Sequence, residues 1–584
     1  MPYNVGGHIS SHPKRCLLYF LALAVDFDGT IARDGRVDAS TYDSLKRLKE
    51  TGRRLVLVTG RELRNLGDSK LDLFDRVVAE NGAVVYDPGT KRHDLLADRP
   101  PPDLIRALKE KKVKPLSVGE SIIATWCPHE TTVLETIREL GLEYQIVFNK
   151  GAVMVLPPGI NKATGLKAAL AEMELSPHNV IGVGDAENDF AFLEACGCSA
   201  AVGNAKPALK NMADVVLEGR WGCGVVELIA QIIANDVEII AAGRHGIRVG
   251  VDRNGDEVQI MPHAGSLLIS GSSGIGKSKL ATALTERMVE KQFQFCVFDP
   301  EGDYDELDHA ICVGNVKTPP NEEQALKLLQ KSATNAVVNT QALEIGARPA
   351  FFVKLLPGVL SLRARTGRPH WLLIDEAHHL LPAGRHELSG VLPKQLPGVI
   401  LITVHPEAVA VEALRTVDTI LALGSKAGEV VATYCKATGV PVPPSLPQPD
   451  DNEGLYYTMA GDTRPLRLDR LQQDHKRHTR KYAEGRLGSD RSFYFRGPEN
   501  ALNLRAHNLM IFLEMAAGID DRTWEHHRQA GDYSRWFREA IKNEELAGEA
   551  AEVERNTRLD PKESRDRIAQ AISRRYTAPV HEVD

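Results

Sequence analysis

Short apolar runs alternate with helical segments over residues 20–234, and this alternation is the pattern that most constrains the fold. The runs and the helical stretches between them fall at residues 21–27, 40–51, 54–59, 162–173 and 180–184. Alternating strands and helices predict a parallel sheet that is covered by helices on its faces. We therefore expect an α/β, Rossmann-like core in this part of the chain.

The alternation is interrupted at about residues 85–158. Residues 121–126 and 143–149 have the character of strands, and residues 129–140 between them have the character of a helix. We expect these residues to form a small α+β insertion that closes over a site.

A second α/β region is predicted from residue 244 to about residue 470. It begins with a hairpin at 246–260 that turns at Asn254-Gly255. Further strands are predicted at residues 266–270, 295–298, 371–374, 399–404 and 419–423. The proline-rich residues 441–449 predict a stiff connector or loop.

The region 471–584 is strongly charged and is predicted to be helical. Four aromatic residues could supply it with a small core: Trp524, Tyr533, Trp536 and Phe537. The basic residues of this region are accompanied by acidic ones, so it does not indicate a platform for nucleic acid.

Composition limits the classes of partner. At roughly 150 residues per domain, 584 residues predict three or four domains. The 71 basic and 78 acidic side chains leave a net charge of −7, which does not indicate nucleic acid, although a local basic groove is compatible with it. The apolar run at 17–25 is far shorter than the ~20 residues of a bilayer span, so no membrane partner is expected. Eight scattered cysteines without a CxxC pair favour a reduced, cytoplasmic protein.

Two carboxylates follow the first predicted strand. Asp26 and Asp28 stand at its carboxyl end, where open α/β sheets place ligands, in a loop tightened by Gly29. One carboxylate can attack phosphorus while the other passes a proton to and from the ester oxygen. Attack by an anion on a phosphate also needs a divalent metal and a nearby cation to neutralise charge. These residues therefore predict a phosphoryl-transfer site.

The remaining parts of such a site follow along the chain. Thr59 ends the second strand with a hydroxyl group, and Lys162 offers an ammonium group at the start of a helix. Asp185 and Asp189, four residues apart, follow another predicted strand. This ordered set resembles the haloacid dehalogenase-like (HAD) phosphatases, in particular the Cof-like or sugar-phosphatase branch (HAD-IIB). Residues 80–83 (Glu-Asn-Gly-Ala) are also typical of that branch.

The resemblance implies a HAD-like phosphatase domain at residues 1–234 with an inserted cap at about 85–158. Asp26 is the implied nucleophile, which forms an aspartyl-phosphate, and Asp28 is the implied general acid and base. Thr59 and Lys162 would hold the phosphoryl group. The implied Mg²⁺ ligands are Asp26, Asp28, Asp185 and Asp189, with Asn188 in support. The expected substrate is a small phosphorylated molecule, for example a sugar phosphate.

A nucleotide-binding loop opens the second region. The residues Gly271, Ser272, Ser273, Gly274, Ile275, Gly276, Lys277 and Ser278 match GxxxxGK[ST] in full, between a predicted strand and a predicted helix. In such a loop backbone N–H groups wrap the phosphates, the lysine reaches the terminal ones and the serine hydroxyl joins the Mg²⁺ shell. Asp375 and Glu376 end a later strand, where Asp375 would hold Mg²⁺ through water and Glu376 would polarise the attacking water. ATP and Mg²⁺ are the expected cofactors.

Two further segments narrow this class. Residues 298–304 follow the next strand, and residues 403–406 end a later one. Together they resemble the HerA/FtsK-type motor ATPases, over about residues 244–469. The resemblance implies that Thr403 and His405 sense the γ-phosphate, with His405 in place of the usual glutamine.

The same resemblance implies a homo-oligomeric ring in which a neighbour supplies an arginine. The sequence leaves four choices open for this arginine: Arg363, Arg365, Arg368 and Arg415. His378 and His379 lack a third ligand at a usual spacing, so they do not predict a metal site.

The sequence leaves more than one function open. The first is a Mg²⁺-dependent phosphomonoester hydrolase whose P-loop domain binds and hydrolyses ATP and regulates or powers it. The alternative is a nucleic-acid-associated motor ATPase with an end-processing phosphatase domain. A third is a kinase–phosphatase pair, in which the P-loop half phosphorylates what the other half dephosphorylates.

Overall fold

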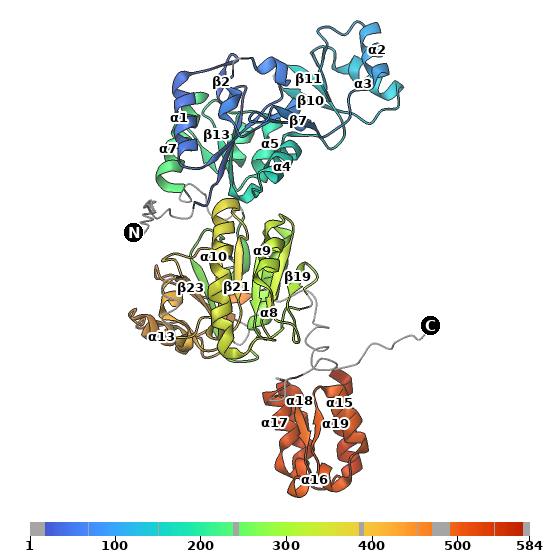
Figure 1. Ribbon diagram of the computed structural model, residues 1–584, viewed down its shortest axis with the longest axis vertical. Coiled ribbons are helices and arrows are strands. Elements are labelled where there is room, and N and C mark those ends of the chain that lie inside the picture. Colours follow the sequence, from blue (N-terminus) through green and yellow to red (C-terminus); the bar gives the residue numbers. More distant parts are fainter. Residues whose placement is uncertain are drawn as a thin grey trace, which may run out of the picture.

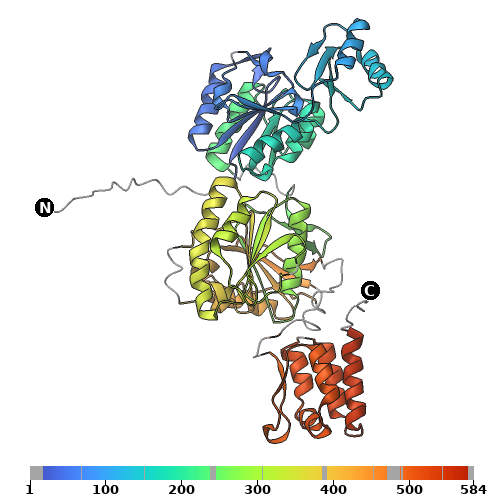
Figure 2. The ribbon, with the colours of Figure 1, turned by 45° about the vertical axis from the view of Figure 1, so that its right-hand side comes forward.

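The computed structural model describes residues 18–67, 69–149, 151–236, 245–305, 307–384, 391–450, 453–469, 487, 491–541 and 543–575. The chain forms a mixed α/β protein with an eight-stranded sheet and a smaller inserted sheet in its first third, a larger mixed sheet after them, and a helical C-terminal part (Figure 1). These parts follow one another along the long axis of the molecule, and the insertion projects from the first (Figures 1 and 2).

The first sheet has eight strands. Its order is β14 (Val215–Val216), β13 (Cys198–Ala201), β12 (Val180–Gly184), β1 (Ala22–Asp26), β4 (Arg54–Val58), β5 (Arg76–Ala79), β6 (Val84–Asp87), β7 (Arg92–Leu95). The strands from β14 to β5 are parallel, and β6 and β7 are antiparallel. Every residue of β1 is buried, as expected for a strand that is covered by helices on both faces. The predicted parallel sheet is confirmed.

Helices cover this sheet on its two sides. Figure 1 shows α1 (Ala39–Glu50) beside α7 (Gly222–Asn235), and α4 (Lys162–Glu172) beside α5 (Phe190–Ala195) on the opposite side. The strands and helices bury one continuous apolar core.

The insertion has its own four-stranded antiparallel sheet. Its order is β10 (Gln145–Asn149), β11 (Ala152–Leu156), β9 (Ile123–Trp126), β8 (Ser117–Val118). The helices α2 (Pro102–Glu110) and α3 (Glu130–Glu139) pack on one face of this sheet, and the other face packs on the first domain. The predicted α+β insertion is therefore present, with both predicted strands and the predicted helix within two residues of the observed bounds.

The second large sheet has eleven strands. Its order is β16 (Glu257–Ile260), β15 (Ile247–Asp252), β25 (Thr463–Leu468), β24 (Glu453–Thr458), β23 (Val417–Leu423), β17 (Ser266–Gly271), β22 (Val399–Thr403), β21 (Trp371–Ile374), β18 (Phe295–Asp299), β20 (Asn335–Asn339), β19 (Ala310–Val313). The strands from β23 to β19 are parallel, whereas β24, β25, β15 and β16 run antiparallel. The predicted hairpin and five predicted strands are present. The sequence did not predict β19, β20, β24 and β25.

Helices lie on both sides of this sheet as well (Figure 2). One face carries α9 (Glu322–Gln330), α10 (Arg348–Thr366) and α13 (Ala427–Thr438), and the other carries α8 (Lys277–Glu290). Residues 345–366, which include α10, are long and apolar enough to cross a membrane by length and composition alone. Phe352, Leu355 and Val359 of α10 are fully buried in the core of this domain, which is the packing of a core helix.

The C-terminal part begins with a short hairpin that the sequence did not predict, β26 (Phe493–Phe495) and β27 (Leu504–Ala506). The helices that follow are α15 (Leu509–Gly518), α16 (Asp521–Ala530), α17 (Asp532–Glu539), α18 (Glu544–Arg555) and α19 (Pro561–Arg575). All four aromatic residues expected in its core are buried there. The start of the predicted region, residues 471–486 and 488–490, lies outside the described residues.

The first and second domains meet through loops at the amino ends of their strands. Arg368 donates a hydrogen bond from Nη2 to the Glu174 carbonyl (2.9 Å). His370 accepts from a backbone N–H at Nδ1, so its Nε2–H donates to Ser176 Oγ (2.9 Å). Arg368 and His370 are buried at this contact. The carboxyl ends of the two sheets, where ligands bind, therefore point away from each other.

A second histidine, His178, lies at this interface. His178 donates from Nε2 to the Lys291 carbonyl (2.8 Å) and stacks on Phe293 with ring centroids 4.0 Å apart. Burial, with a smaller contribution from His245, lowers the pKa of His178 to about 3 from its ordinary 6.5. His178 is therefore neutral in the folded protein at neutral pH.

We expect this histidine to make the protein sensitive to acid. Because the pKa of His178 is lower in the folded protein than in the unfolded chain, the unfolded chain binds a proton first as the pH falls. The contribution of His178 to the free energy of unfolding is therefore complete above pH 6.5 and decreases as the pH falls toward 3. At pH 5.5 this contribution to the free energy of unfolding is ~1.4 kcal/mol smaller than at pH 7.5. The thermal midpoint of His178→Gln should thus fall less between pH 7.5 and 5.5 than that of the wild type. His309→Gln, at an exposed position, is the control; a pH dependence of His178→Gln equal to that of the wild type would contradict the expectation.

Candidate active sites

The first site lies where two neighbouring parallel strands end. Asp26 is the last residue of β1, and Asp185 directly follows β12, which pairs with β1. Asp189 ends a short 3₁₀ turn beyond it. Ligand atoms of these three buried carboxylates lie within 4.8 Å of one another. Carboxylate oxygens are the ligands that Mg²⁺ prefers, so this cluster fits such an ion.

Lys162 supplies a positive charge to this cluster. Its Nζ lies 2.6 Å from Asp26 Oδ1 and 2.6 Å from Asp189 Oδ1. The Asn161 side chain accepts a hydrogen bond from Thr164 N (3.0 Å) and starts α4 at the point that aims Lys162 into the site. Burial opposes the charge of Lys162, but Asp189 and Asp26 outweigh it and raise its pKa. The lysine is therefore a fixed cation beside the expected nucleophile.

The surroundings of Asp26 fix its position and its charge. Thr30 Oγ1 donates to Asp26 Oδ2 at 3.0 Å. Burial raises the pKa of Asp26 to about 7, Asp189 acts in the same direction and Lys162 opposes it. A divalent cation in the cluster would favour the ionised, nucleophilic form.

The side chain of Asp28 points elsewhere. Both of its oxygens accept hydrogen bonds from Arg61, each at 2.7 Å, and it lies outside the three-carboxylate cluster. Thr59 is fully buried, and its hydroxyl accepts from the backbone N–H of Arg61 (3.1 Å). Arg61 was not predicted as a site residue, although it directly follows Thr59-Gly60; only the fold shows that it pairs with a residue 33 positions away.

Glu80 fastens the cap to the core. Its two carboxylate oxygens accept hydrogen bonds from the backbone N–H groups of Glu120 (2.9 Å), Ser121 (2.9 Å) and Ile122 (3.2 Å). Glu80 is 2% exposed and has a positive φ of 52°. We call this contact the cap clamp. The sequence motif at residues 80–83 includes Glu80, but it did not predict this contact with the cap.

We expect Glu80→Gln to loosen the cap. The amide has one acceptor oxygen where the carboxylate has two, and hydrogen bonds to charged groups contribute ~1.5–3 kcal/mol. KM for p-nitrophenyl phosphate should rise about tenfold, with a smaller change in kcat, in steady-state assays. Glu120→Gln is the matched control, because its side chain faces His93 and Arg99 instead of the clamp; equal KM values for the two variants would be against a clamping role.

The second site is the nucleotide-binding loop between β17 and α8. Gly274 and Gly276 have φ values of 80° and 105°, which favour glycine, and Gly276 is the N-cap of α8. Lys277 Nζ donates to the carbonyls of Gly271 and Ser272, at 3.1 Å each. The N-terminus of α8 and this loop offer N–H groups to an anion. The predicted residues 271–278 are thus arranged as a phosphate-binding loop.

Carboxylates gather at the same edge of the sheet. Asp375 follows β21 and is 2% exposed; burial, then Asp303 and Glu376, raise its pKa well above the ordinary value. Glu376 has a positive φ of 40°, which is strained for a residue other than glycine. Ser278 Oγ donates to Asp303 Oδ2 at 3.2 Å.

The two residues that were predicted to sense the γ-phosphate, Thr403 and His405, have different surroundings. Thr403 is fully buried, and its Oγ1 lies 2.9 Å from His378 Nδ1, which is 3.4 Å from Glu376 Oε2. The His405 ring is exposed and its Nδ1 lies 3.2 Å from Glu407 Oε1. The structure thus places His378, which the sequence did not assign to this site, beside both Thr403 and Glu376.

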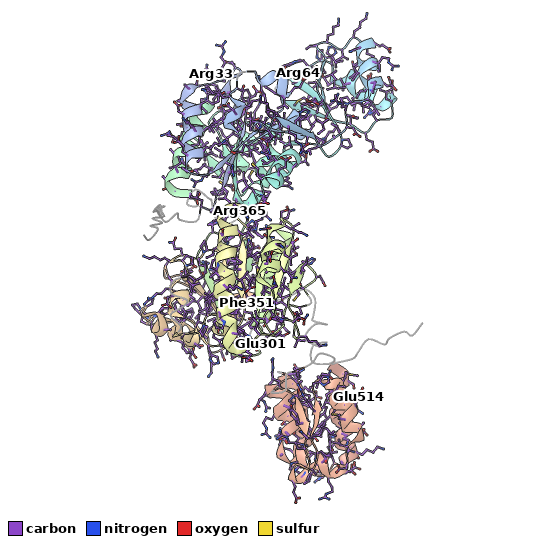
Figure 3. The ribbon with its side chains drawn as sticks, in the orientation of Figure 1. Arg33, Arg64, Glu301, Phe351, Arg365 and Glu514 are labelled. Atoms are coloured by element: carbon purple, nitrogen blue, oxygen red, sulfur yellow. The ribbon has the colours of Figure 1, made fainter. Side chains whose placement is uncertain are left out.

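The structure distinguishes the four arginines that the sequence left as candidates for the arginine supplied by a neighbouring copy. Arg363 is buried and donates to the carbonyls of four residues: Pro369, His370, Pro397 and Gly398. Arg368 is used at the interface between the first two domains, and Arg365 lines a cleft of about 680 Å³ beside that interface (Figure 3). Arg415 remains exposed. Arg363 and Arg368 are therefore buried, whereas Arg365 and Arg415 are exposed, and only Arg365 of these two lies beside the first domain.

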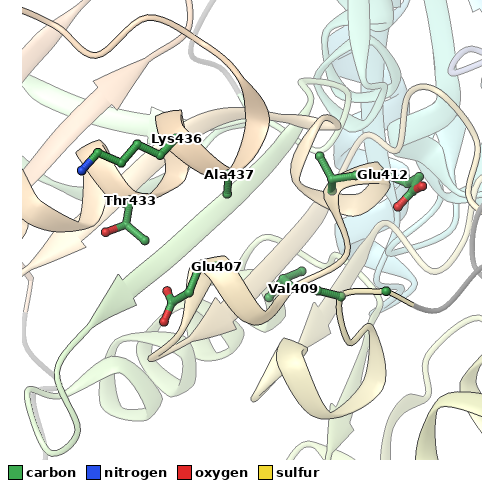
Figure 4. A pocket seen from close by; sticks show the side chains of 9 residues that line it. Glu407, Val409, Glu412, Thr433, Lys436 and Ala437 are labelled. Atoms are coloured by element: carbon green, nitrogen blue, oxygen red, sulfur yellow. The ribbon is translucent and has the colours of Figure 1, made fainter.

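A separate hollow of about 560 Å³ lies beside the sensor loop. The residues that line it precede β22 (Ala383 and Gly384), follow β22 or belong to α13, and they include Glu407, Val409, Glu412, Thr433 and Lys436 (Figure 4). No residue of the phosphate-binding loop lines it, so this hollow is distinct from the nucleotide site.

Comparisons with known proteins match both of the domains that carry these sites. The haloacid dehalogenase-like hydrolase family matches residues 23–125 and 129–229. The central domain of the helicase HerA matches residues 263–349. The phosphoglycolate phosphatase of Methanothermobacter thermautotrophicus is 31% identical over 223 residues, which are 36% of this chain and 98% of that protein. The phosphoglycolate phosphatase of Aeropyrum pernix is 29% identical over 227 residues, covering 36% and 92% respectively.

The chain therefore belongs, through its first third, to the haloacid dehalogenase-like hydrolases, and it carries a HerA central domain after it. Among solved structures, a haloacid dehalogenase-like hydrolase from Bacteroides thetaiotaomicron is 18% identical, with a TM-score of 0.32, over 36% of this chain and 99% of that chain.

Proposed function

We propose that the first domain is a Mg²⁺-dependent phosphomonoester hydrolase. The observation that carries this proposal is the buried Lys162 ammonium, 2.6 Å from Asp26, beside the three-carboxylate cluster. An Asp26 oxygen would attack phosphorus, and Asp28, once it turns away from Arg61 and is protonated, would give its proton to the departing alkoxide. Water, deprotonated by Asp28, would then cleave the aspartyl-phosphate and free Asp26. Mg²⁺, held by Asp26, Asp185 and Asp189, would neutralise charge on the phosphate.

The substrate is proposed to be small. The relatives that match over nearly their whole length are named phosphoglycolate phosphatases, which supports a phosphoglycolate-like monoester as the first candidate and a sugar phosphate as the second. A cap that is clamped over the site supports this choice, because it excludes water and extended polymers.

We further propose that the second domain binds and hydrolyses ATP. Lys277 and Ser278 would hold the phosphates and Mg²⁺, Asp375 would assist through water, and Glu376 would polarise the attacking water. Thr403, which shares the neighbour His378 with Glu376, would sense the γ-phosphate. A ring of copies in the cytoplasm belongs to this proposal, with Arg415 as the arginine supplied in trans.

The ATPase is proposed to regulate or power the phosphatase. The two sheets meet at their amino ends, so a phosphoryl group cannot pass directly from one site to the other. This arrangement argues against a kinase–phosphatase pair that shares one bound substrate. It supports coupling through the histidine interface instead.

Two substitutions test whether the sites are separate. Asp26→Asn should reduce phosphatase turnover to background and leave ATP hydrolysis unchanged, whereas Lys277→Ala should do the reverse. Asp28→Asn should lower phosphatase turnover by ~10²–10⁴-fold, as for loss of a general acid–base group. Phosphate release and ADP formation are measured on the same preparations. Loss of both activities in a folded Asp26→Asn protein would contradict two independent sites.

A second experiment separates the metabolic enzyme from the nucleic-acid motor. ATP hydrolysis is measured with and without duplex DNA at several salt concentrations, and phosphate release is screened on phosphoglycolate, sugar phosphates and 5′-phosphorylated DNA ends. We expect turnover of a small phosphomonoester and little DNA stimulation, because the net charge is −7. Strong stimulation by DNA that falls steeply with salt would favour the motor instead.

A further inference from the structure

Asp299, the last residue of β18, holds the loop of residues 300–304 in one conformation through hydrogen bonds to its backbone. Asp299 is fully buried, and its carboxylate accepts hydrogen bonds from the backbone N–H groups of Glu301 (3.1 Å), Gly302 (2.7 Å) and Tyr304 (2.9 Å). Gly302 has a φ of 75°, which glycine adopts without strain. The loop is therefore a fixed element, and the side chains that it presents have defined positions.

The loop carries Asp303 to the phosphate-binding loop. Asp303 Oδ2 accepts the hydrogen bond of Ser278 Oγ at 3.2 Å, and Ser278 is the residue whose hydroxyl is expected in the Mg²⁺ shell. On the other side, Asp375 N donates to the carbonyl of Phe298, next to the loop (3.0 Å). Asp303 thus belongs to the same group of residues as Ser278 and Asp375.

Tyr304 provides a second, independent observation. Its side chain is 1% exposed, and its hydroxyl has no hydrogen-bond partner within the described part of the chain. Burial raises the pKa of Tyr304 well above its ordinary value, and the charges of Asp375 and Asp303 act in the same direction. A buried hydroxyl without a partner costs free energy, and a ligand bound among the carboxylates whose charges act on Tyr304 would supply that partner.

The chemistry of the donor set fits a divalent cation. The carboxylates of Asp299 and Asp375 are buried at this edge of the sheet, and Asp303 adds a third carboxylate beside Ser278. Lys277, the nearby cation of the phosphate-binding loop, donates to two carbonyls of that loop. Hard oxygen ligands of this kind are the ones with which Mg²⁺ binds together with its substrate phosphates.

We propose that Asp303 acts with Ser278 and Asp375 to hold the Mg²⁺ of the bound nucleotide, and that the Tyr304 hydroxyl donates a hydrogen bond within that shell. Asp303 would be a third protein group for the ion, supplied by the segment 298–304. This inference rests on the proposed ATP binding of the second domain.

The test measures nucleotide affinity instead of turnover. Binding of a fluorescent ATP analogue is titrated with Mg²⁺ and with EDTA, for the full-length wild type and Asp303→Asn. The asparagine keeps an acceptor for Ser278 but removes the charge. We expect the gain in affinity that Mg²⁺ provides to fall 10–100-fold in Asp303→Asn, while affinity in EDTA stays equal or increases. Tyr304→Phe should lower the same gain by a smaller factor.

Asp305→Asn is the matched control. It removes a charge from the same segment, but its carboxylate accepts from Asn339 Nδ2 (2.5 Å) instead of facing Ser278. Phosphatase turnover by the first domain of each variant reports that the chain is folded. Electron paramagnetic resonance of Mn²⁺ with ADP should show weaker metal binding in Asp303→Asn and not in Asp305→Asn.

The outcomes distinguish failure of the proposed ATP binding from failure of the proposed role of Asp303. A wild type whose nucleotide binding is absent, or is insensitive to Lys277→Ala, would overturn the proposed ATPase itself. Wild-type binding that depends on Mg²⁺, together with an unchanged Mg²⁺ gain in Asp303→Asn, would overturn only the role of Asp303. If Asp303→Asn and Asp305→Asn lost the same part of the Mg²⁺ gain in affinity, the loss would come from the removed charge in general. That result would also overturn the role of Asp303.

Discussion

The buried ion pairs of Lys162 are the interaction on which the first domain depends. Three buried carboxylates within 4.8 Å repel one another, and one ammonium group at 2.6 Å from two of them offsets part of that repulsion. To bring Lys162 there, α4 packs tightly on the segment before the cap: a Cβ atom at Gly165 would lie 2.5 Å from Gly82 Cα. The same segment holds Glu80, so the helix that delivers the charge also positions the cap clamp.

The second domain also brings several carboxylates together at one edge of its sheet, but its lysine is held differently. Parallel strands again bring acidic residues to one edge, where burial raises the pKa of Asp375 and of Asp299. Here the phosphate-binding loop lies beside them, and Lys277 is bonded to the loop itself. Because the two sheets meet at their amino ends, these two acidic edges face away from each other, and the neutral histidines of the interface separate them.

The local parts of both sites could be predicted from the sequence. Strand ends followed by Asp26, Asp185 and Asp375, and the glycines of the phosphate-binding loop, are features of a few consecutive residues. The antiparallel strands β24 and β25, inside the sheet, were missed because their pairing depends on partners that are not adjacent in the sequence, such as β23 and β15. The hairpin β26–β27 was missed because its strands have only three residues each and lie in a segment whose composition indicates helices.

The sequence by itself determined the chemistry: which carboxylates, which lysines and which hydroxyl groups are present, and at which strand ends. Tertiary structure alone decided the partners, because contacts form across long separations in the chain. It paired Asp28 with Arg61, joined His378 to Thr403, and assigned Arg368 to the domain interface. A pattern of residues limits local conformation, whereas the distance between two side chains depends on how whole sheets and helices pack.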